Sequence, residues 1–447
     1  MVLKIKNLFL LLKSKSSFFK ENIWVIFTEY LWLLGVFIIS LLYNRFYGTA
    51  SLGVFSYGTA VSQIAILGLG SAFSNLIMRD VGTSSKLNRV YLTKVLQIRS
   101  FIIFLTLIIV SVIQFLLFPL TVHDQFIFII LLIFAKGLDA LCDTFYMIFL
   151  SVKMYKKYST IKILHAVSAI VFVAVSCFLK YSILVTYLAI LSSSFLFFII
   201  NIFYYYRHKN EINNIENPVI KADFILKTPE TISFRYLAKE SWSLLLSVVF
   251  FQIGSRINTL IIFGLIGSVS LGVYSSSYML ITCFTAAAPI MGVVMFPVLN
   301  KNFLEDPIKL SRFVLKIIPL IFFLGIMATI VSFFSIPIAI KLMKNMPDYA
   351  YSIFAIMILV IPFNYIIGVI NSIFIIIKKQ SIGMIVTFVM LVVNMALVYF
   401  GALYYQIKGV AVASVIGSFF QVVLFISVYL VVNKKFIGQN RNSLKNI

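Results

Sequence analysis

A few ionisable residues interrupt the long apolar runs of this sequence, where burial makes a charge costly and a functional role common. Three of them, Lys136, Asp139 and Asp143, follow an i, i+3, i+7 spacing that places them on one stripe of a helix. One lysine cannot neutralise two carboxylates equally, so a second cation or a proton is required nearby. The stripe is therefore either a structural ion-pair cluster or a site where a carboxylate loads and releases an ion. Glu29 is a further carboxylate of this kind, while His165 is expected to be a polar packing residue rather than a proton relay.

A guanidinium lies deep in another apolar run, in the segment SRINTLIIFG that contains Arg256 and Asn258. Guanidinium is the side-chain group best suited to bind a pyrophosphate through two parallel hydrogen bonds. The alternative is structural, with Arg256 paired to Glu29 or Asp139. Arg45, at the end of the first apolar run, is either a ligand contact or an interface anchor.

The elements that carry these residues are predicted to be membrane helices. The chain of 447 residues is 62% hydrophobic, 16% aromatic and only 11% charged, so it holds more apolar surface than a soluble domain buries. Apolar runs of about twenty residues, the length that crosses the hydrocarbon core, recur along the chain. We therefore predict an all-α polytopic membrane protein. Twelve transmembrane helices are expected, beginning near Ile23, Ser51, Ile98, Phe126, Ser159, Tyr181, Glu240, Val269, Val314, Tyr351, Ser381 and Lys408.

The net charge of +23 does not indicate nucleic-acid binding, because of where the cations lie. Most of the 37 Lys and Arg residues fall in the two tails and in the alternate loops on the same side of the membrane. This asymmetry follows the positive-inside rule and predicts that both termini are cytoplasmic. The basic loops also lack the stacking aromatics of a nucleic-acid groove.

One peptide occurs twice in the chain. GTASLGVFSY at Gly48–Tyr57 returns as GSVSLGVYSS at Gly267–Ser276, and KKYS at Lys156–Ser159 is echoed by KKQS at Lys378–Ser381. Six predicted spans separate the copies of each pair, and an even number of crossings preserves orientation. The sequence therefore predicts two parallel repeats of six helices, an architecture found among secondary transporters.

These observations divide the chain into five parts. A basic cytoplasmic segment (1–22) is expected to precede an N-terminal six-helix bundle (23–206), a cytoplasmic linker (207–239), a C-terminal six-helix bundle (240–433) and a cytoplasmic tail (434–447). The three cysteines lie singly in apolar runs, so neither a disulfide nor a metal site is expected. No G-x-x-x-x-G-K-[ST] motif occurs, which argues against an ATP motor, and no cofactor is expected.

Two segments carry a family resemblance. NRFYGTASLGVFSYGTA, with Arg45, Gly48 and Gly53 spaced R-x-x-G-x-x-x-x-G, resembles the start of the polysaccharide-transporter branch of the multidrug/oligosaccharidyl-lipid/polysaccharide (MOP) exporter superfamily. The O-antigen flippases (Wzx) of that branch typically carry R-x-L-G-P-E-x-x-G. Near the C-terminus, VNMALVYFGALYYQIKGVAVASVIG resembles the family pattern N-x-x-L followed by G-x-x-G-A-A-x-A-T. The residues that depart from these patterns are Tyr47, Thr49, Ala50, Gln406, Val410 and Ser414.

The resemblance implies a flippase rather than an enzyme. Such a protein moves an undecaprenyl-pyrophosphate-linked oligosaccharide, for example an O-antigen repeat unit for lipopolysaccharide biosynthesis, from the cytoplasmic to the periplasmic leaflet by alternating access. Carried onto this chain, it implies that Arg256 and Lys136 meet the pyrophosphate, that Asn258 bonds to sugar hydroxyls, and that Arg45 serves an outer gate.

The same resemblance implies coupling and partners. Glu29, Asp139 and Asp143 are the expected sites for an ion gradient to act. The expected partners are the lipid-linked glycan, the bilayer of the bacterial inner membrane, and a polysaccharide polymerase with its chain-length regulator.

Three other functions share parts of this pattern. A multidrug exporter of the same superfamily would use the intramembrane carboxylates to bind organic cations. A peptidoglycan-precursor flippase commonly has fourteen spans rather than twelve. A membrane O-antigen polymerase usually has a large periplasmic loop, whereas the longest polar stretch here is predicted to be internal.

Overall fold

The structure is a computed structural model that describes residues 16–66, 73–74, 77, 81, 87–117, 123–214, 234–288, 299, 307–344, 346–377 and 379–445. These residues form helices and short connections, and no strand occurs among them. Most of the predicted N-terminal segment, and residues 215–233 of the predicted linker, lie outside the described residues.

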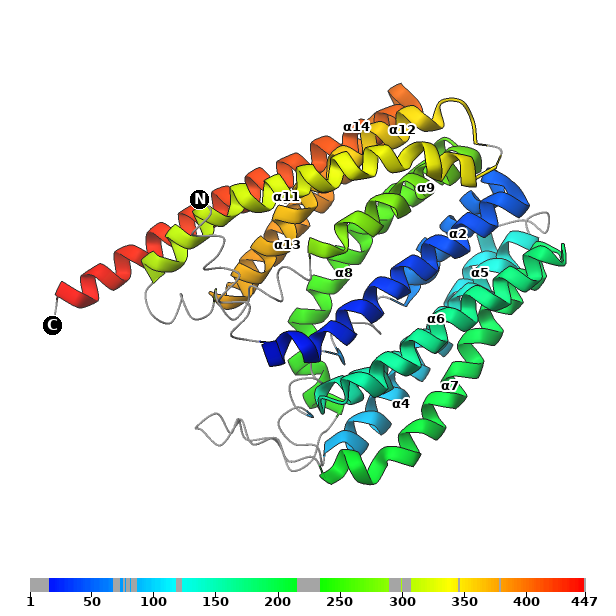
Figure 1. The fold of residues 1–447 in the computed structure, drawn as a ribbon, viewed down its shortest axis with the longest axis horizontal. Coiled ribbons are helices and arrows are strands. Elements are labelled where there is room, and N and C mark those ends of the chain that lie inside the picture. Colours follow the sequence, from blue (N-terminus) through cyan, green and yellow to red (C-terminus); the bar gives the residue numbers. More distant parts are fainter. Residues whose placement is uncertain are drawn as a thin grey trace. The chain divides into compact units, whose positions relative to one another are not determined.

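The described helices follow one another along the chain (Figure 1). They are α2 (Ser16–Ala65), α4 (Asn88–Leu117), α5 (His123–Ser151), α6 (Tyr155–Phe178), α7 (Ile183–Asn214), α8 (Phe234–Leu265), α9 (Ser268–Thr285), α11 (Pro307–Leu342), α12 (Ala350–Met357), the 3₁₀ turn η4 (Ile358–Val360), α13 (Ile361–Ile376) and α14 (Gln380–Lys445).

Each predicted span begins in one of these helices or within two residues of one, and the second and eighth spans continue beyond the described residues. α2 and α14 contain two spans each, because their helical geometry is interrupted at Gly48 (φ 86°, ψ 170°) and at Gln406 (φ 51°, ψ −140°). α12, η4 and α13 form one further span, which turns through the 3₁₀ segment. The predicted all-α polytopic fold is confirmed.

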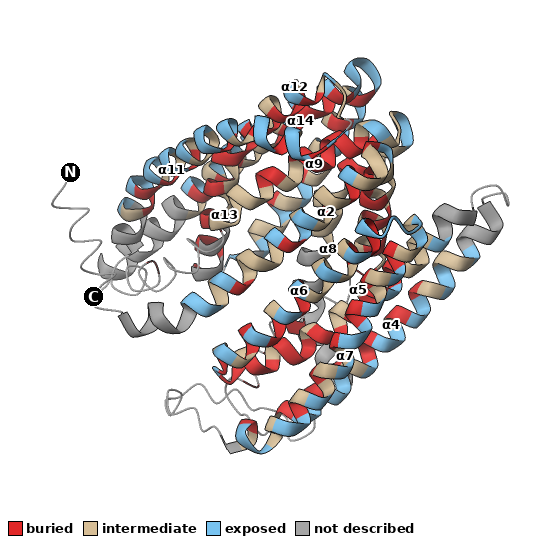
Figure 2. Ribbon diagram, turned by 45° about the vertical axis from the view of Figure 1, so that its right-hand side comes forward, coloured by how far each residue is buried: buried red, intermediate tan, exposed pale blue. Residues whose placement is uncertain are grey.

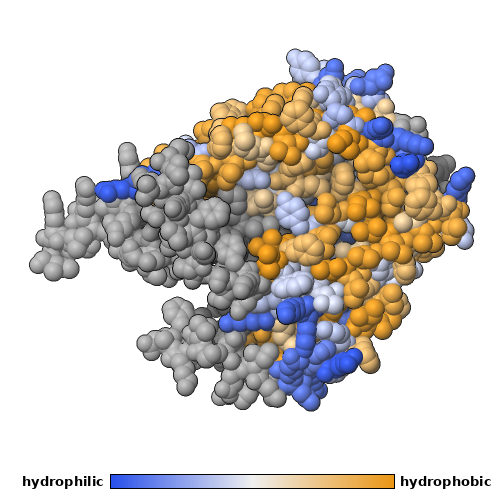
Figure 3. Space-filling view, viewed as in Figure 1, coloured by the Kyte–Doolittle hydropathy of each residue, from blue (hydrophilic) through white to orange (hydrophobic). Residues whose placement is uncertain are grey.

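The described helices are suited to a bilayer. Seven stretches are long and apolar enough to cross a membrane, and two of them, Ile23–Ala65 and Ser381–Val432, are the interrupted helices. Large apolar side chains lie on the outside, with Phe203 72% and Phe334 70% exposed. On the face shown in Figure 3, apolar residues dominate along the described helices and hydrophilic residues gather toward their ends. Lipid tails can cover such a surface, whereas water cannot do so without cost.

The chain groups into two bodies. The first body comprises residues 1–36, 68–121 and 130–242, and the second comprises residues 37–67, 122–129 and 243–447. In the first body, α6 and α7 pack side by side (Figure 1), and buried residues alternate with exposed residues around each helix (Figure 2). In the second body, α13 packs against α11 and α14. The sequence-based boundaries of the two six-helix bundles stay a prediction.

The repeated peptide forms the same corner twice. Gly48 interrupts α2, and Gly267 (φ 107°, ψ 177°) separates α8 from α9. Glycine adopts this backbone conformation without the steric cost that a Cβ would add. The chain folds back at the first corner. The rings of Tyr43 and Phe55, which lie on opposite sides of Gly48 in the sequence, stack with centroids 4.5 Å apart. The sequence repeat is thus a repeated helix–corner–helix unit.

The two copies of the peptide also pack against each other within the second body. A Cβ added at Gly53 would lie 1.9 Å from the carbonyl oxygen of Ser268, and one at Gly272 would lie 2.0 Å from that of Thr49. The contact is reciprocal, because the sixth residue of each copy meets the second residue of the other. Membrane helices approach this closely only where a side chain is absent. The glycines therefore permit a direct backbone contact between the two repeats.

Gln406 stands at the corner of α14 where the family pattern has glycine. Its positive φ is uncommon for a residue with a Cβ and strains the backbone. Beside the corner the two arms of α14 meet closely, since a Cβ at Gly409 would lie 2.1 Å from the carbonyl oxygen of Gly401. The departure from the family pattern thus places strain at a tight turn.

Candidate functional site

An ionic network occupies the interior of the first body, where α2, α4, α5, α6 and α7 each contribute a polar side chain. One part of it joins α2 to α6. Lys162 Nζ donates to Glu29 Oε1 at 2.6 Å, and the hydroxyl of Tyr158 donates to the same oxygen. Lys162 is only 8% exposed, and its ammonium also lies 5.8 Å from the centre of the Trp32 ring. A buried ammonium is stable here because a carboxylate and aromatic faces surround it.

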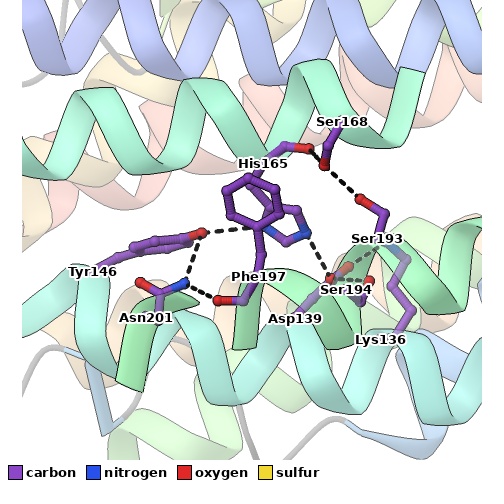
Figure 4. Close-up of polar contacts among 9 residues, drawn as sticks. All are labelled: Lys136, Asp139, Tyr146, His165, Ser168, Ser193, Ser194, Phe197 and Asn201. Atoms are coloured by element: carbon purple, nitrogen blue, oxygen red, sulfur yellow. Dashed lines mark hydrogen bonds and ion pairs between the residues drawn. The ribbon is translucent and has the colours of Figure 1, made fainter. Parts of the chain in front are cut away.

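The stripe predicted on α5 forms the second part of the network (Figure 4). Lys136 Nζ donates to Asp139 Oδ2 at 2.9 Å, the ion pair expected from an i, i+3 spacing. Ser194 of α7 donates to Asp139 Oδ1 at 2.6 Å, and His165 Nε2 lies 3.6 Å from the same oxygen. Asp139 is therefore held from three helices.

His165 of α6 is enclosed by polar and aromatic groups (Figure 4). Its Nδ1 lies 3.1 Å from the hydroxyl of Tyr146, which also accepts a hydrogen bond from Asn201 at 3.4 Å. The ring of Phe197 stacks on the imidazole with centroids 4.8 Å apart. The imidazole bridges Asp139 and Tyr146 and packs against Phe197 of α7, while its predicted role as a packing residue stays a prediction.

Arg99 is a fully buried cation on α4. Its Nη1 donates to the carbonyl oxygen of Ala140 and to Thr144 Oγ1, the latter at 2.7 Å. The charges of Arg99 and Lys162 both act on Asp143. Arg99 of α4 and Lys162 of α6 are thus the further cations that act on the α5 stripe.

Two carboxylates of this network, Glu29 and Asp139, form ion pairs with lysines of the same body. Their partners within the first body are Lys162 and Lys136, respectively. Arg256 belongs to the second body, so its alternative pairing with either carboxylate stays a prediction. The network therefore holds Glu29 and Asp139 as ion pairs, and neither carboxylate is free to bind a cation without displacing its lysine.

Arg256 lies on α8 in the second body. Its Nε is buried and has no hydrogen-bond partner within the described part of the chain. Its charge acts on Tyr274 of α9. Among the described residues, Arg256 and Arg45 of the second body form no ion pair, and Arg256 is the one of the two with a buried nitrogen that lacks a hydrogen-bond partner.

Asn258 lies two residues further along α8 and lines a cavity of about 610 Å³ inside the second body. It is 8% exposed and donates to the hydroxyl of Tyr274 at 3.1 Å. Its own oxygen accepts a hydrogen bond from Asn394 of α14 at 3.2 Å. The amide therefore has a fixed orientation at the cavity wall.

The predicted residues fall into separate groups. Lys136 lies in the network of the first body with the three carboxylates, whereas Arg256 and Asn258 lie in the second body. Arg45, also in the second body, is exposed three residues before the corner at Gly48.

Two buried cations of the network were not among the predicted site residues. Lys162 and Arg99 each lie near the end of an apolar run and look like loop cations in the sequence. For Lys162 a signal exists, because Tyr158, Lys162 and His165 share one helical face at i, i+4 and i+7. For Arg99 no comparable pattern occurs.

Sequence comparison identifies the family. A family model described as "Polysaccharide biosynthesis protein" matches residues 37–303, more than half of the chain. The chain belongs to this family. The resemblance to the polysaccharide branch of the MOP superfamily is confirmed at that level. No curated protein shows a significant sequence match to this chain.

The family member has the fold of MOP-superfamily transporters. An inward-facing multidrug resistance MATE family transporter of that superfamily superposes with a TM-score of 0.68 at 14% identity, covering 93% of this chain and 96% of the other. A mutant of the Vibrio cholerae MATE transporter VcmN gives 0.65 at 13% identity, with 95% and 98% covered. A MOP superfamily transporter from Pyrococcus furiosus Vc1 gives 0.63 at 13% identity, with 93% and 96% covered. Family and fold together indicate a multi-pass membrane transporter of this superfamily.

Proposed function

We propose that this protein is a flippase that moves a polyprenyl-pyrophosphate-linked oligosaccharide from the cytoplasmic to the periplasmic leaflet of a bacterial inner membrane. Undecaprenyl pyrophosphate is the proposed carrier, and an O-antigen or related surface polysaccharide repeat unit is the proposed cargo. Membership of a polysaccharide biosynthesis family supports this proposal. A polymerase and a chain-length regulator would use the translocated unit, and both chain termini would lie in the cytoplasm.

The observation that carries the proposal is the guanidinium of Arg256. A buried charged group without a partner is costly unless a ligand compensates it. Arg256 is half-buried, and its Nε is buried without a hydrogen-bond partner among the described residues. A pyrophosphate offers adjacent anionic oxygens that a guanidinium binds through paired hydrogen bonds.

The carboxylates of the first body favour an anionic substrate over a cationic one. Glu29 and Asp139 each form an ion pair with a lysine of the chain. An organic cation would have to displace that lysine to reach the carboxylate. The structurally similar transporter from Pyrococcus furiosus is described as having a binding pocket of reverse polarity, so the fold accommodates a change in the charge of its site.

The other predicted residues take subordinate roles in this proposal. Lys136 is a second cation for the pyrophosphate, Asn258 contacts the sugars, and Arg45 lies at an outer gate. Coupling to an ion gradient would act on Asp139 or on the other two carboxylates of the network. Exchange of an ion there changes the charge balance of the first body and can drive a change between two conformations.

The test is an Arg256 series in proteoliposomes. The probe is undecaprenyl pyrophosphate bearing a short fluorescent oligosaccharide, and the measurement is its rate of appearance in the opposite leaflet. We expect Arg256→Ala to lower this rate at least tenfold, and Arg256→Lys to restore part of it, because an ammonium keeps the charge without the planar fork. Arg312→Ala, at an exposed arginine of α11, is the matched control and should leave the rate unchanged.

A wild-type rate in Arg256→Ala would remove this residue from the mechanism and with it the main support for the proposal. A loss of folded protein in both Arg256 variants, with an unchanged rate per folded molecule, would assign Arg256 a structural role instead.

A further inference from the structure

The second body contains a cavity lined by carboxamides. Its volume is about 610 Å³, and α8, α9, α13 and both arms of α14 contribute to its wall. Hydroxyl groups of Ser and Thr and the phenols of two tyrosines complete the polar lining, and none of the described side chains that line it is charged. We call it the amide cavity after its four carboxamides, which are Asn258, Asn364, Asn394 and Gln421.

One side of the amide cavity is a hydrogen-bonded chain with a fixed direction. Asn394 donates to Asn258, which donates to the hydroxyl of Tyr274. Ser414 donates to the carbonyl oxygen of Val410, so in the 3.4 Å contact between the two hydroxyls Tyr274 must be the donor. The second N–H of Asn258 and that of Asn394 take no part in this series of hydrogen bonds, so each can donate to a ligand.

On the other side of the amide cavity, two carboxamides have no hydrogen-bond partner among the described residues. Asn364 on α13 and Gln421 on α14 form no side-chain hydrogen bond among the described residues. Each carboxamide offers two donors and an acceptor with two lone pairs. Polar groups inside a membrane protein are costly unless a partner is present. Both side chains are half-buried at the cavity wall, so their amides can pair with an occupant that both donates and accepts hydrogen bonds.

The cavity also has the space and the flat surfaces that a ring needs. Its volume lies within the usual range for a small-molecule site, roughly 300–1,000 Å³. Three glycines, Gly254, Gly368 and Gly417, form part of the wall, and a Cβ at Gly417 would lie 2.7 Å from Asn394 Oδ1. The rings of Tyr274 and Tyr278 are nearly parallel, at 13°. Aromatic faces of this kind pack against the C–H faces of sugar rings.

These features select one chemical class of ligand. A charged ligand would find no ion partner among the described lining residues, and an apolar one would leave the amides unsatisfied. A sugar hydroxyl both donates and accepts, so neighbouring hydroxyls of one ring can pair with the N–H and C=O of a carboxamide. We infer that the amide cavity binds one uncharged sugar residue and so selects which glycans the transporter accepts. This inference rests on the proposed flippase function, whose pyrophosphate contact lies at Arg256, outside the cavity lining.

A direct test uses the wild-type protein in lipid nanodiscs. The probe is a diazirine derivative of N-acetylglucosamine, and mass spectrometry maps the crosslinked peptides. We expect crosslinks on the peptides that contain Asn364 and Gln421, and we expect free N-acetylglucosamine or glucose to compete for them. Glucuronic acid and an organic cation, tetraphenylphosphonium, should not compete. Crosslinks elsewhere only, or none, would overturn the inference and leave the cavity as a site for water.

A variant series tests the same site by affinity. Asn364→Leu and Gln421→Leu remove amides that take no part in the hydrogen bonds from Asn394 through Asn258 to Tyr274. The cavity wall should therefore remain folded. We expect each to weaken competition by N-acetylglucosamine about tenfold, the effect of losing about 1.4 kcal/mol. Thr329→Val, a polar-to-apolar change on α11 outside the cavity, is the matched control.

The two variants also separate this inference from the proposed function. Unchanged sugar competition in both leucine variants would overturn the assignment of the cavity, even if lipid-linked glycan is translocated normally. Conversely, sugar binding that depends on Asn364 and Gln421, in a protein that does not translocate the lipid-linked glycan, would retain the sugar site and reject the flippase.

Discussion

Replacement of the contacting glycines should separate the two repeats. Gly53→Ala places a Cβ 1.9 Å from the Ser268 carbonyl oxygen, and Gly272→Ala places one 2.0 Å from the Thr49 carbonyl oxygen. Both neighbours are backbone atoms of a helix, so no side chain can rotate away. The helices themselves must move apart, and in the process they lose the reciprocal contact.

The size of the effect follows from these distances. Ordinary contacts begin at 3.4 Å, so each substitution requires a displacement of about 1.5 Å. Overpacking in a well-packed core costs about 1–3 kcal/mol, and a rigid backbone neighbour places these variants at the upper end. Alanine regains about 1 kcal/mol of helix propensity over glycine. We expect a net loss of about 2 kcal/mol for either variant, and less than the sum for the double variant because both relieve one contact.

Thermal unfolding of purified protein in detergent measures this loss. Gly264→Ala on α8 is the matched control, because a Cβ there would meet no atom within 4 Å. It should be neutral or stabilising by up to about 1 kcal/mol. Gly53→Ala and Gly272→Ala variants that unfold like Gly264→Ala would refute the direct contact between the repeated peptides.

The remaining predictions concern strain, charge and topology. Gln406→Gly should raise stability by about 1 kcal/mol by relieving a positive φ, as measured by thermal unfolding; a loss of stability would contradict the strained corner. Lys162→Met should lower stability by about 2 kcal/mol, since Glu29 is left without its lysine at a partly exposed site. Adding Glu29→Gln should recover part of this loss, and a double variant no more stable than Lys162→Met would show that the two residues are not coupled. A reporter active only in the periplasm should be silent when fused after Lys435 and active when inserted at Gly48; activity after Lys435 would invert the predicted orientation.

The sequence predicts the fold well because two of its features recur along the chain: apolar runs of membrane length and the repeated peptide at the glycine corners. Apolar runs of membrane length locate the helices, and each interrupted helix marks its corner at a residue that a motif already contains. Gly48 and Gly267 stand at equivalent corners because only glycine tolerates that backbone conformation readily. Gln406, by contrast, occupies such a corner without being glycine, so its role is visible only through the family pattern and the observed φ.

The site is harder to predict because it is assembled between helices. The Lys136–Asp139 pair follows from spacing on one helix, and its observed geometry agrees with that spacing. Lys162 lies at the end of an apolar run, where a lysine can equally well extend to the membrane surface. Asn364 and Gln421 are isolated amides in distant helices, and only tertiary packing brings them to one cavity.

Translocation by the wild-type protein distinguishes a lipid-linked glycan flippase from a multidrug exporter. Proteoliposomes would contain the fluorescent undecaprenyl-pyrophosphate oligosaccharide in one experiment and a cationic dye in a parallel one, with an ion gradient imposed in both. We expect transfer of the lipid-linked oligosaccharide to the opposite leaflet and no export of the dye, because Glu29 and Asp139 already form ion pairs with lysines of the chain. Export of the dye without movement of the lipid-linked oligosaccharide would rule out the flippase and identify a multidrug exporter.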